Sequence, residues 1–185
     1  KLHAGGMRGV RLSTRVKGYG GMELLEATAA RIRPFGWHVQ LHLSDGSELA
    51  QLEDKLMAME VPLVFDHFAR ISGPGATESA GFKSLCRLLT QRDDCWMKLS
   101  SYYNFSTAGA PDYADMRPIA RALFELRGDR LVWGSNWPHP NRFPPKTPPN
   151  EGDLLDVLKG WAPDEAALRK ILVDNPAALY GFPEV

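Results

Sequence analysis

Residues 131–139 read Leu-Val-Trp-Gly-Ser-Asn-Trp-Pro-His, an apolar run that leads into a polar turn. A nearly continuous apolar run is typical of a strand that is buried on both faces in a parallel sheet. The segment therefore predicts a strand over residues 131–137, with Asn136 and His139 at its carboxyl end. Because α/β folds bind ligands at the carboxyl ends of their strands, this stretch also indicates where a site lies.

Four more segments predict strands of the same kind, and helical patterns separate them. The expected strands cover residues 9–12, 37–43, 61–67 and 95–101. The expected helices cover residues 22–35, 49–59, 82–89, 118–127, 153–160 and 163–173, followed by a last turn from Asn175. Asp45 is the expected N-cap of the second helix, and Pro163 is expected at the first position of the last long one. This alternation predicts a parallel sheet covered by helices.

Five strands are also compatible with an open, flavodoxin-like sheet. However, no Gly-rich phosphate loop joins a strand to a helix, and polar residues gather at the strand ends instead. That distribution is typical of a barrel. The predicted fold class is therefore α/β, a (β/α)8 TIM-type barrel of which this chain shows about the last five strand–helix units.

The composition excludes several classes of partner. Lys plus Arg and Asp plus Glu total 22 each, so no net charge attracts nucleic acid or an anionic membrane. No apolar run reaches the ~18 residues that span a bilayer. The two cysteines lack the spacing of a metal site, and with no signal peptide core the expected location is the cytoplasm. Oligomerisation is left open.

Two histidines follow predicted neighbouring strands. His42 ends one strand, and Asp66-His67 ends the next. Either histidine could simply be a hydrogen-bonded residue at a strand end, and for His42 that interpretation is favoured when it is taken alone. Their occurrence on adjacent strands strengthens a functional interpretation of both. Imidazole titrates near neutral pH and binds metals, so general-base and ligand roles are both open.

Basic residues at other strand ends could hold an anion. Arg11 alternates with apolar neighbours in its strand, and its guanidinium could hold a carboxylate with two hydrogen bonds. For Arg8, Arg15 and Lys17, scattered surface charge is the favoured interpretation. Lys98 lies within an apolar strand, where a structural ion pair and a substrate contact are equally good explanations.

Four short motifs occur in order along the chain: residues 65–68 (Phe-Asp-His-Phe), 96–100 (Trp-Met-Lys-Leu-Ser), 133–140 (Trp-Gly-Ser-Asn-Trp-Pro-His-Pro) and 175–182 (Asn-Pro to Gly-Phe). Together they resemble amidohydrolase family 2, in the branch of pyrone-dicarboxylate hydrolases and sugar lactonases. The resemblance implies a barrel that opens a cyclic ester by attack of water. It also implies a first strand with His-x-His, which this sequence lacks, so residues 1–185 are expected to be the C-terminal part of one barrel domain.

The resemblance assigns roles to several residues. His67 matches the histidine that polarises the lactone carbonyl, and Arg11 matches an arginine that binds a carboxylate. Lys17 is the best match to a second basic group, and His139 completes the Trp-Pro-His motif as a substrate-binding candidate.

Three positions depart from the family pattern. His42 stands where the pyrone hydrolases have a tyrosine, and Asn104 stands where they have an arginine. Asn136 replaces an aspartate that takes a proton from water or binds a metal, and an amide does neither at neutral pH. The pyrone dicarboxylate itself is therefore not the expected substrate.

The leading hypothesis is a hydrolase that opens a lactone or similar cyclic ester of a small carboxylate. In it His67 polarises the carbonyl, His42 is the base with Asn136 assisting, and Arg11 anchors a carboxylate, with Lys17, Asn104 and His139 as further substrate contacts. A barrel that binds a small carboxylate without catalysis is the first alternative, motivated by Asn136 and Asn104. A metal-dependent decarboxylase is the second. No cofactor is certain, and His42 is the best candidate ligand for zinc or manganese.

Overall fold

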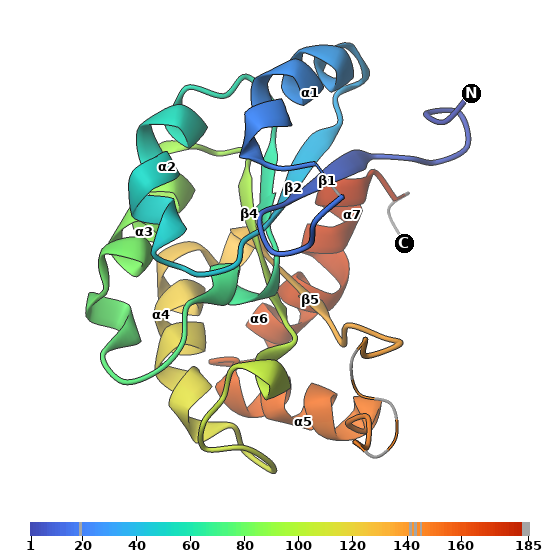
Figure 1. Cartoon of the computed structure of the whole chain (residues 1–185). Coiled ribbons are helices and arrows are strands. Elements are labelled where there is room, and N and C mark those ends of the chain that lie inside the picture. The colour runs from blue at the N-terminus through green and yellow to red at the C-terminus, as the bar shows by residue number, and fades with distance from the viewer. Residues whose placement is uncertain (19, 141, 143, 145, 183–185) are drawn as a thin grey trace.

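The computed structural model describes residues 1–18, 20–140, 142, 144 and 146–182. Its centre is one sheet of five parallel strands in the order β1-β2-β3-β4-β5 (Figure 1). The strands are β1 (Gly9–Ser13), β2 (His38–His42), β3 (Leu63–Phe65), β4 (Cys95–Ser100) and β5 (Leu131–Gly134). Each strand pairs with the next one along the chain, whereas a flavodoxin-like sheet has the order 2-1-3-4-5. The strand order therefore favours the barrel over the open sheet.

Helices cover one face of this sheet (Figure 1). They are α1 (Leu25–Ile32), α2 (Glu48–Met57), α3 (Ala80–Gln91), α4 (Arg117–Arg127), α5 (Glu151–Trp161) and α6 (Glu165–Arg169). The last helix, α7 (Asn175–Tyr180), contacts the other face. Alternate strand residues such as Leu41, Phe65 and Met97 are fully buried in the core between the sheet and the helices. Among the described residues, no helix is both long enough and apolar enough to cross a membrane.

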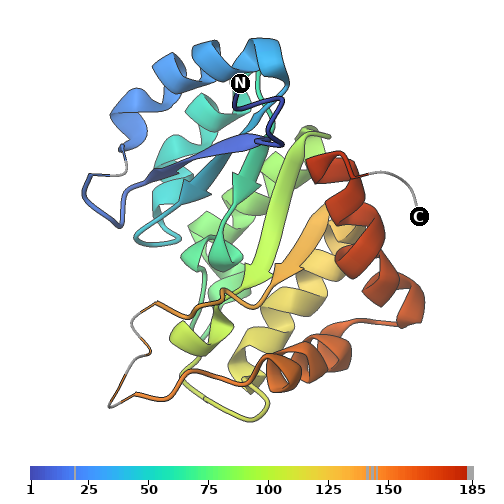
Figure 2. The same cartoon turned by 90° about the vertical axis from the view of Figure 1, so that its right-hand side faces the viewer.

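The other face of the sheet, seen in Figure 2, is different in character. It carries a small apolar cluster of Val64, Trp96 and Val132, and Leu179 of α7 packs against this cluster. Beside it the strands present polar groups, including His38. A Cβ atom on Gly9 would lie 2.3 Å from Nε2 of His38, so only glycine leaves room for that ring. The sheet is therefore apolar on its helix-covered face and largely polar on the other.

Two predicted strands end earlier than their sequence suggested. The ladder of β3 stops at Phe65 because the chain then enters a left-handed turn, and that of β5 stops at Gly134 because Asn136 adopts a left-handed φ of 73°. Both turns place polar side chains at the end of the sheet.

Two predicted helix starts were wrong. Asp45 does not cap α2: its carboxylate accepts a hydrogen bond from the backbone of Ser47, and α2 begins at Glu48. Pro163 is not in a helix, because α6 begins at Glu165 and the Asp164 side chain caps it. The predicted single helix over 163–173 is instead α6 followed by a π-helical turn, Lys170–Asp174.

Candidate active site

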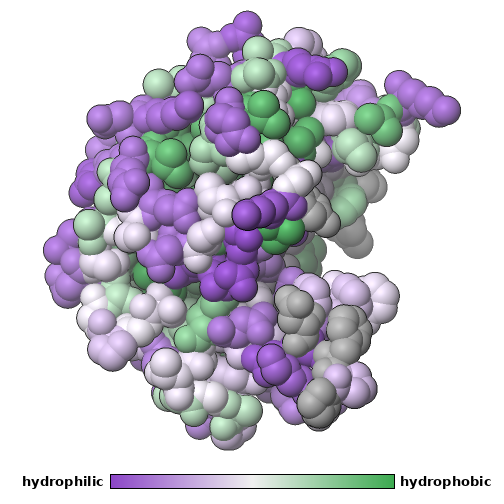
Figure 3. Space-filling model, in the orientation of Figure 1, coloured by the Kyte–Doolittle hydropathy of each residue, from purple (hydrophilic) through white to green (hydrophobic). Residues whose placement is uncertain are grey.

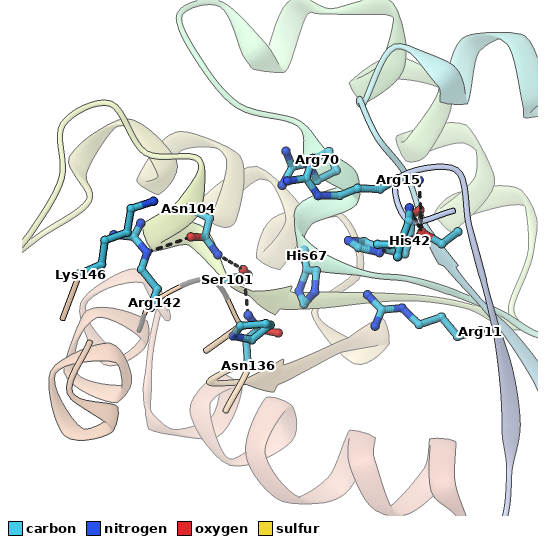
Figure 4. Close-up of a pocket in the computed structure, with 13 residues that line it drawn as sticks. Arg11, Arg15, His42, His67, Arg70, Ser101, Asn104, Asn136, Arg142 and Lys146 are labelled. Atoms are coloured by element: carbon cyan, nitrogen blue, oxygen red, sulfur yellow. Dashed lines mark hydrogen bonds between the residues drawn. The ribbon is translucent and has the colours of Figure 1, made fainter. Parts of the chain in front are cut away.

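A cavity of about 540 Å³ lies at the carboxyl ends of the strands (Figure 4). Its thirteen lining residues are Arg11, Ser13, Arg15, Val16, His42, His67, Arg70, Ser101, Asn104, Asn136, Pro140, Arg142 and Lys146. Five of these residues are Arg or Lys and none is Asp or Glu, so the cavity is suited to an anionic ligand. Figure 3 shows mainly hydrophilic residues around the hollow on this side of the molecule. The structure thus brings together five of the seven predicted site residues.

His42 is held by the end of the neighbouring strand. Its Nδ1 lies 3.2 Å from Oγ of Ser13, and that hydroxyl also contacts the carbonyl oxygen of His42 at 3.2 Å. When the hydroxyl donates to this carbonyl, Nδ1–H donates to the hydroxyl and Nε2 keeps its lone pair. His42 can then accept a proton at Nε2.

His67 lies next to His42, with the ring centroids 5.4 Å apart and the rings nearly perpendicular. Its Nδ1 is 2.7 Å from Oγ of Ser100. When Ser100 donates to Nδ1, the ring hydrogen is on Nε2, which lies 3.4 Å from Oδ2 of Asp66 and is the atom at which His67 can donate a hydrogen bond.

Both imidazoles are neutral at neutral pH. Burial lowers the pKa of His67 to about 4. Burial also lowers the pKa of His42 to about 4, and the positive charge of Arg11 adds to the effect. In a neutral pair, one imidazole can accept a hydrogen bond or proton while the other donates a hydrogen bond. Two imidazolium ions could only donate.

A left-handed turn directly after β3 sets the direction of His67. The four residues His67–Arg70 have φ values of 52°, 54°, 49° and 62°, and none of them is glycine. Such backbone costs about 1 kcal/mol or more per residue. Phe68 is fully buried against Tyr102 and Trp161, and this packing holds the turn in place. His67 and Arg70 are three residues apart in the sequence, and the turn places both side chains in the same cavity.

Beneath the cavity, the strands carry a charged layer that we call the floor, made of Arg11, Gln40, Asp66 and Lys98. Asp66 is its hub, because Oδ2 lies 2.7 Å from the Arg11 guanidinium and accepts a hydrogen bond from Gln40 at 3.0 Å. Nζ of Lys98 lies 3.4 Å from Oδ1. Burial alone would raise the pKa of Asp66, but Lys98, His67 and Arg11 hold it below its usual value. Arg11 thus binds the carboxylate of Asp66, a residue of the same chain.

Asn136 is oriented by a chain of hydrogen bonds. Its Nδ2 donates to the hydroxyl of Tyr103 at 2.9 Å and to Ser101 at 3.3 Å. The Tyr103 hydroxyl lies 2.8 Å from Nδ1 of His139, whose Nε2 lies 2.7 Å from Glu151. With both amide hydrogens donated, Oδ1 of Asn136 remains as an acceptor.

The same contacts place His139 outside the cavity. It is buried, and both of its ring nitrogens contact protein groups, so its link to the cavity runs through Tyr103 and Asn136. Lys17 is also not among the lining residues, whereas Arg15 is. The hydroxyl of Ser13 accepts a hydrogen bond from the backbone N–H of Val16 at 3.0 Å and so holds the segment from which Arg15 lines the cavity.

Asn104 contacts a positively charged side chain from a segment that is distant in the sequence. Its Oδ1 accepts a hydrogen bond from Nε of Arg142 at 3.2 Å, and Arg142 also donates to the Tyr103 carbonyl oxygen at 2.9 Å. The position at which the resemblance implied an arginine therefore has a guanidinium beside it.

Four basic side chains form what we call the rim of the cavity: Arg15, Arg70, Arg142 and Lys146. None of the four was predicted to be a site residue, because no pattern in the sequence indicates that these segments meet.

The described residues contain no group of three or more His, Cys, Asp and Glu side chains that could hold a metal ion. His42 and His67 are neighbours, but the nearby carboxylate of Asp66 is occupied by Arg11 and Gln40. These residues alone therefore do not fit a metal, and the role of His42 as a zinc or manganese ligand stays a prediction.

Comparison with known proteins identifies the family. The amidohydrolase family model matches residues 1–182. The chain is 40% identical over 183 residues to a 4-sulfomuconolactone hydrolase of Rhizobium radiobacter, covering 97% of this chain and 60% of that protein. It is 32% identical over 194 residues to a 2-pyrone-4,6-dicarboxylate hydrolase of Comamonas testosteroni, covering 100% and 63%. The chain thus spans about three-fifths of the length of these relatives.

Solved structures support the same conclusion. A crystal structure of an Agrobacterium tumefaciens protein without ligand superposes with a TM-score of 0.88 at 30% identity, covering 100% of this chain and 64% of that one. The five parallel strands are accordingly part of a TIM-type barrel, which confirms the predicted fold class. The chain therefore belongs to the amidohydrolase family.

Proposed function

We propose that this chain provides the strand-end side of the active site of a hydrolase that opens a lactone of a small acid. The observation that carries the proposal is the pair of neutral imidazoles, His42 and His67, in a cavity with five basic lining residues and no acidic one. The names of the two relatives describe hydrolases of a sulfo-substituted lactone and of a pyrone with two carboxylates. Both substrates are cyclic esters with acidic groups.

The two histidines supply complementary parts of the reaction. Nε2–H of His67 donates to the ester carbonyl oxygen, which draws electron density from the carbonyl carbon. Nε2 of His42 takes a hydrogen from water while the water oxygen bonds to that carbon. Oδ1 of Asn136 accepts a hydrogen bond from the other O–H of the water and so orients it, and that hydrogen stays on the attacking oxygen. The ester C–O bond then breaks, the ring oxygen leaves with the proton held by His42, and the product is a hydroxy acid.

The rim holds the acidic groups of the substrate. The loss of the family's arginine at Asn104 argued against a substrate with two acidic groups, but Arg142 places a guanidinium beside Asn104. We therefore expect the substrates to include acidic lactones with more than one anionic group.

The test is a panel of lactones incubated with the natural full-length protein, with and without added zinc or manganese. We expect ring opening of the acidic lactones, and a loss of about 10²–10⁴-fold in kcat for His42→Asn and for His67→Asn. The neighbouring buried His38→Asn, which lies outside the cavity, is the matched control. If no lactone is hydrolysed under any of these conditions, the proposal is wrong.

A further inference from the structure

The hydrogen bonds of Asn136 lead away from the cavity to the first turn of α5. Nδ2 of Asn136 lies 2.9 Å from the hydroxyl of Tyr103, and that hydroxyl lies 2.8 Å from Nδ1 of His139. Nε2 of His139 lies 2.7 Å from Oε1 of Glu151, the first residue of α5. Tyr103 and His139 are buried, whereas the Glu151 side chain is 44% exposed. One chain of contacts therefore joins a cavity residue to a carboxylate near the surface.

This chain of hydrogen bonds has a direction, and Glu151 sets it. An ionised carboxylate can only accept, so the hydrogen of a neutral His139 ring lies on Nε2. Nδ1 then has a lone pair and accepts the hydroxyl hydrogen of Tyr103. The Tyr103 oxygen in turn accepts from an N–H of Asn136, which is the contact that the structure shows. Every donor along the chain thus points toward Glu151.

The direction decides which atom of the Asn136 amide is left for the cavity. Nitrogen and oxygen of an amide can exchange places in almost the same space, and the hydrogen-bond partners determine which arrangement holds. With Nδ2 on the Tyr103 hydroxyl, Oδ1 remains and can accept a hydrogen bond from water. In the reverse arrangement Nδ2 would remain, and it could only donate. The two arrangements therefore have opposite chemistry in the cavity.

The other neighbour of the amide, Ser101, selects neither arrangement. Arg142 donates to Oδ1 of Asn104, so Nδ2 of Asn104 is left to donate to Oγ of Ser101 at 2.8 Å (Figure 4). The Ser101 hydroxyl still has a lone pair and its own hydrogen, so it could accept from Nδ2 or donate to Oδ1 of Asn136. Its contact with Asn136, at 3.3 Å, is also the longer one. The selection therefore comes from the side of Tyr103.

We propose that Glu151 is a positioning residue that acts through His139 and Tyr103 and holds the Asn136 amide with its oxygen toward the cavity. The proposal rests on the proposed function for what that oxygen does in lactone opening, but not for the orientation itself. It gives His139, which was predicted to contact the substrate, a role behind Asn136 instead.

The first experiment measures the direction of the chain without catalysis. Nitrogen NMR of the natural full-length protein, isotopically labelled at histidine, reports which ring nitrogen carries the hydrogen, and His139→Gln identifies the signals of His139. We expect the hydrogen on Nε2 in the unaltered protein. In Glu151→Gln the new amide can donate as well as accept, so a form with the hydrogen on Nδ1 should appear. A hydrogen on Nδ1 in the unaltered protein, or no change in Glu151→Gln, overturns the proposal.

The second experiment measures the effect on the reaction. With an acidic lactone that the protein opens, Glu151→Gln should lower kcat about fivefold, the value of one neutral hydrogen bond, because part of the molecules then turn Nδ2 of Asn136 to the cavity. KM should stay within about twofold, because the basic side chains of the rim are unchanged.

Glu165→Gln is the matched control. Glu165 is likewise the first residue of a helix, α6, but it is exposed and lies outside the cavity lining. Its substitution removes the same charge from a helix N-terminus, so it reproduces any general effect of that loss. We expect kcat of this control within about twofold of the unaltered protein.

Combination with Tyr103→Phe separates a positioning role from a structural one. Tyr103→Phe cuts the chain, so in that background Glu151→Gln should lower kcat by less than about twofold. An equal loss in both backgrounds is the result of a purely structural role, and that result, or an unchanged kcat in Glu151→Gln alone, overturns the proposal. If the protein opens no lactone but Glu151→Gln moves the hydrogen of His139, the orientation by Glu151 stands and the hydrolase is rejected.

Discussion

The floor and the rim of the cavity both carry positive charge, but they differ in what balances it. In the floor, the buried carboxylate of Asp66 lies between Arg11, Gln40 and Lys98, so that both cations have a carboxylate of the fold beside them. In the rim, Arg70 and Arg142 contact neutral protein groups. A compensated charge mainly serves the structure, whereas an uncompensated one facing a cavity is available to a ligand.

The largest expected effect comes from breaking the floor. Asp66→Asn removes the negative charge and leaves Arg11 and Lys98 facing each other across a buried amide. We expect a loss of about 3 kcal/mol in the free energy of unfolding, at the low end for a broken buried pair because Arg11 is 37% exposed. Chemical denaturation of the variant measures it. Asp45→Asn, which removes an exposed carboxylate, should lie within about 0.5 kcal/mol of the unaltered protein.

An equal stability of Asp66→Asn and Asp45→Asn would show that the floor is not held by Asp66. The distinction between a structural floor and a ligand-binding rim would then lose its basis.

A smaller effect is expected in the hydrogen-bond network of Asn136, which meets the rim where Arg142 donates to the carbonyl oxygen of Tyr103. Tyr103→Phe removes the hydroxyl that accepts from Nδ2 of Asn136 and contacts His139. The amide then loses its fixed orientation, and we expect kcat for lactone opening to fall about tenfold with KM nearly unchanged. Tyr113→Phe removes a hydroxyl from the neighbouring aromatic cluster outside the cavity and is the matched control.

The outcome that contradicts this role is a Tyr103→Phe variant that loses stability and raises KM but keeps kcat. Tyr103 would then be a packing residue, and the orientation of Asn136 would not matter to the reaction.

The strands and their carboxyl ends could be predicted from the sequence, and the rim could not. Apolar runs such as 63–65 and 131–133 predicted the strands, and a strand of known direction places His42, His67 and Asn136 at one edge. The rim depends on contacts that no local pattern encodes. Arg142 meets Asn104 across 38 residues of sequence, and Arg70 reaches the cavity through a left-handed turn of non-glycine residues. Tertiary packing, here of Phe68, stabilises that turn.

The smallest expected effect is a change in the pH dependence of activity, and it connects Arg11 of the floor to the two histidines. Because the pKa of both His42 and His67 is lowered to about 4, they stay neutral as pH falls through 6.5, the ordinary pKa of histidine. We expect kcat/KM for a neutral lactone to stay constant down to about pH 5 and to fall as pH approaches 4.

Arg11→Gln removes a positive charge that lowers the pKa of His42, so this fall of kcat/KM at acid pH, the acid limb, should move to higher pH. Burial is the larger cause and remains, so the limb should stay below 6.5. An acid limb of the unaltered protein near pH 6.5 would show that the two imidazoles are not shielded from protonation, and that the division into one acceptor and one donor is incorrect.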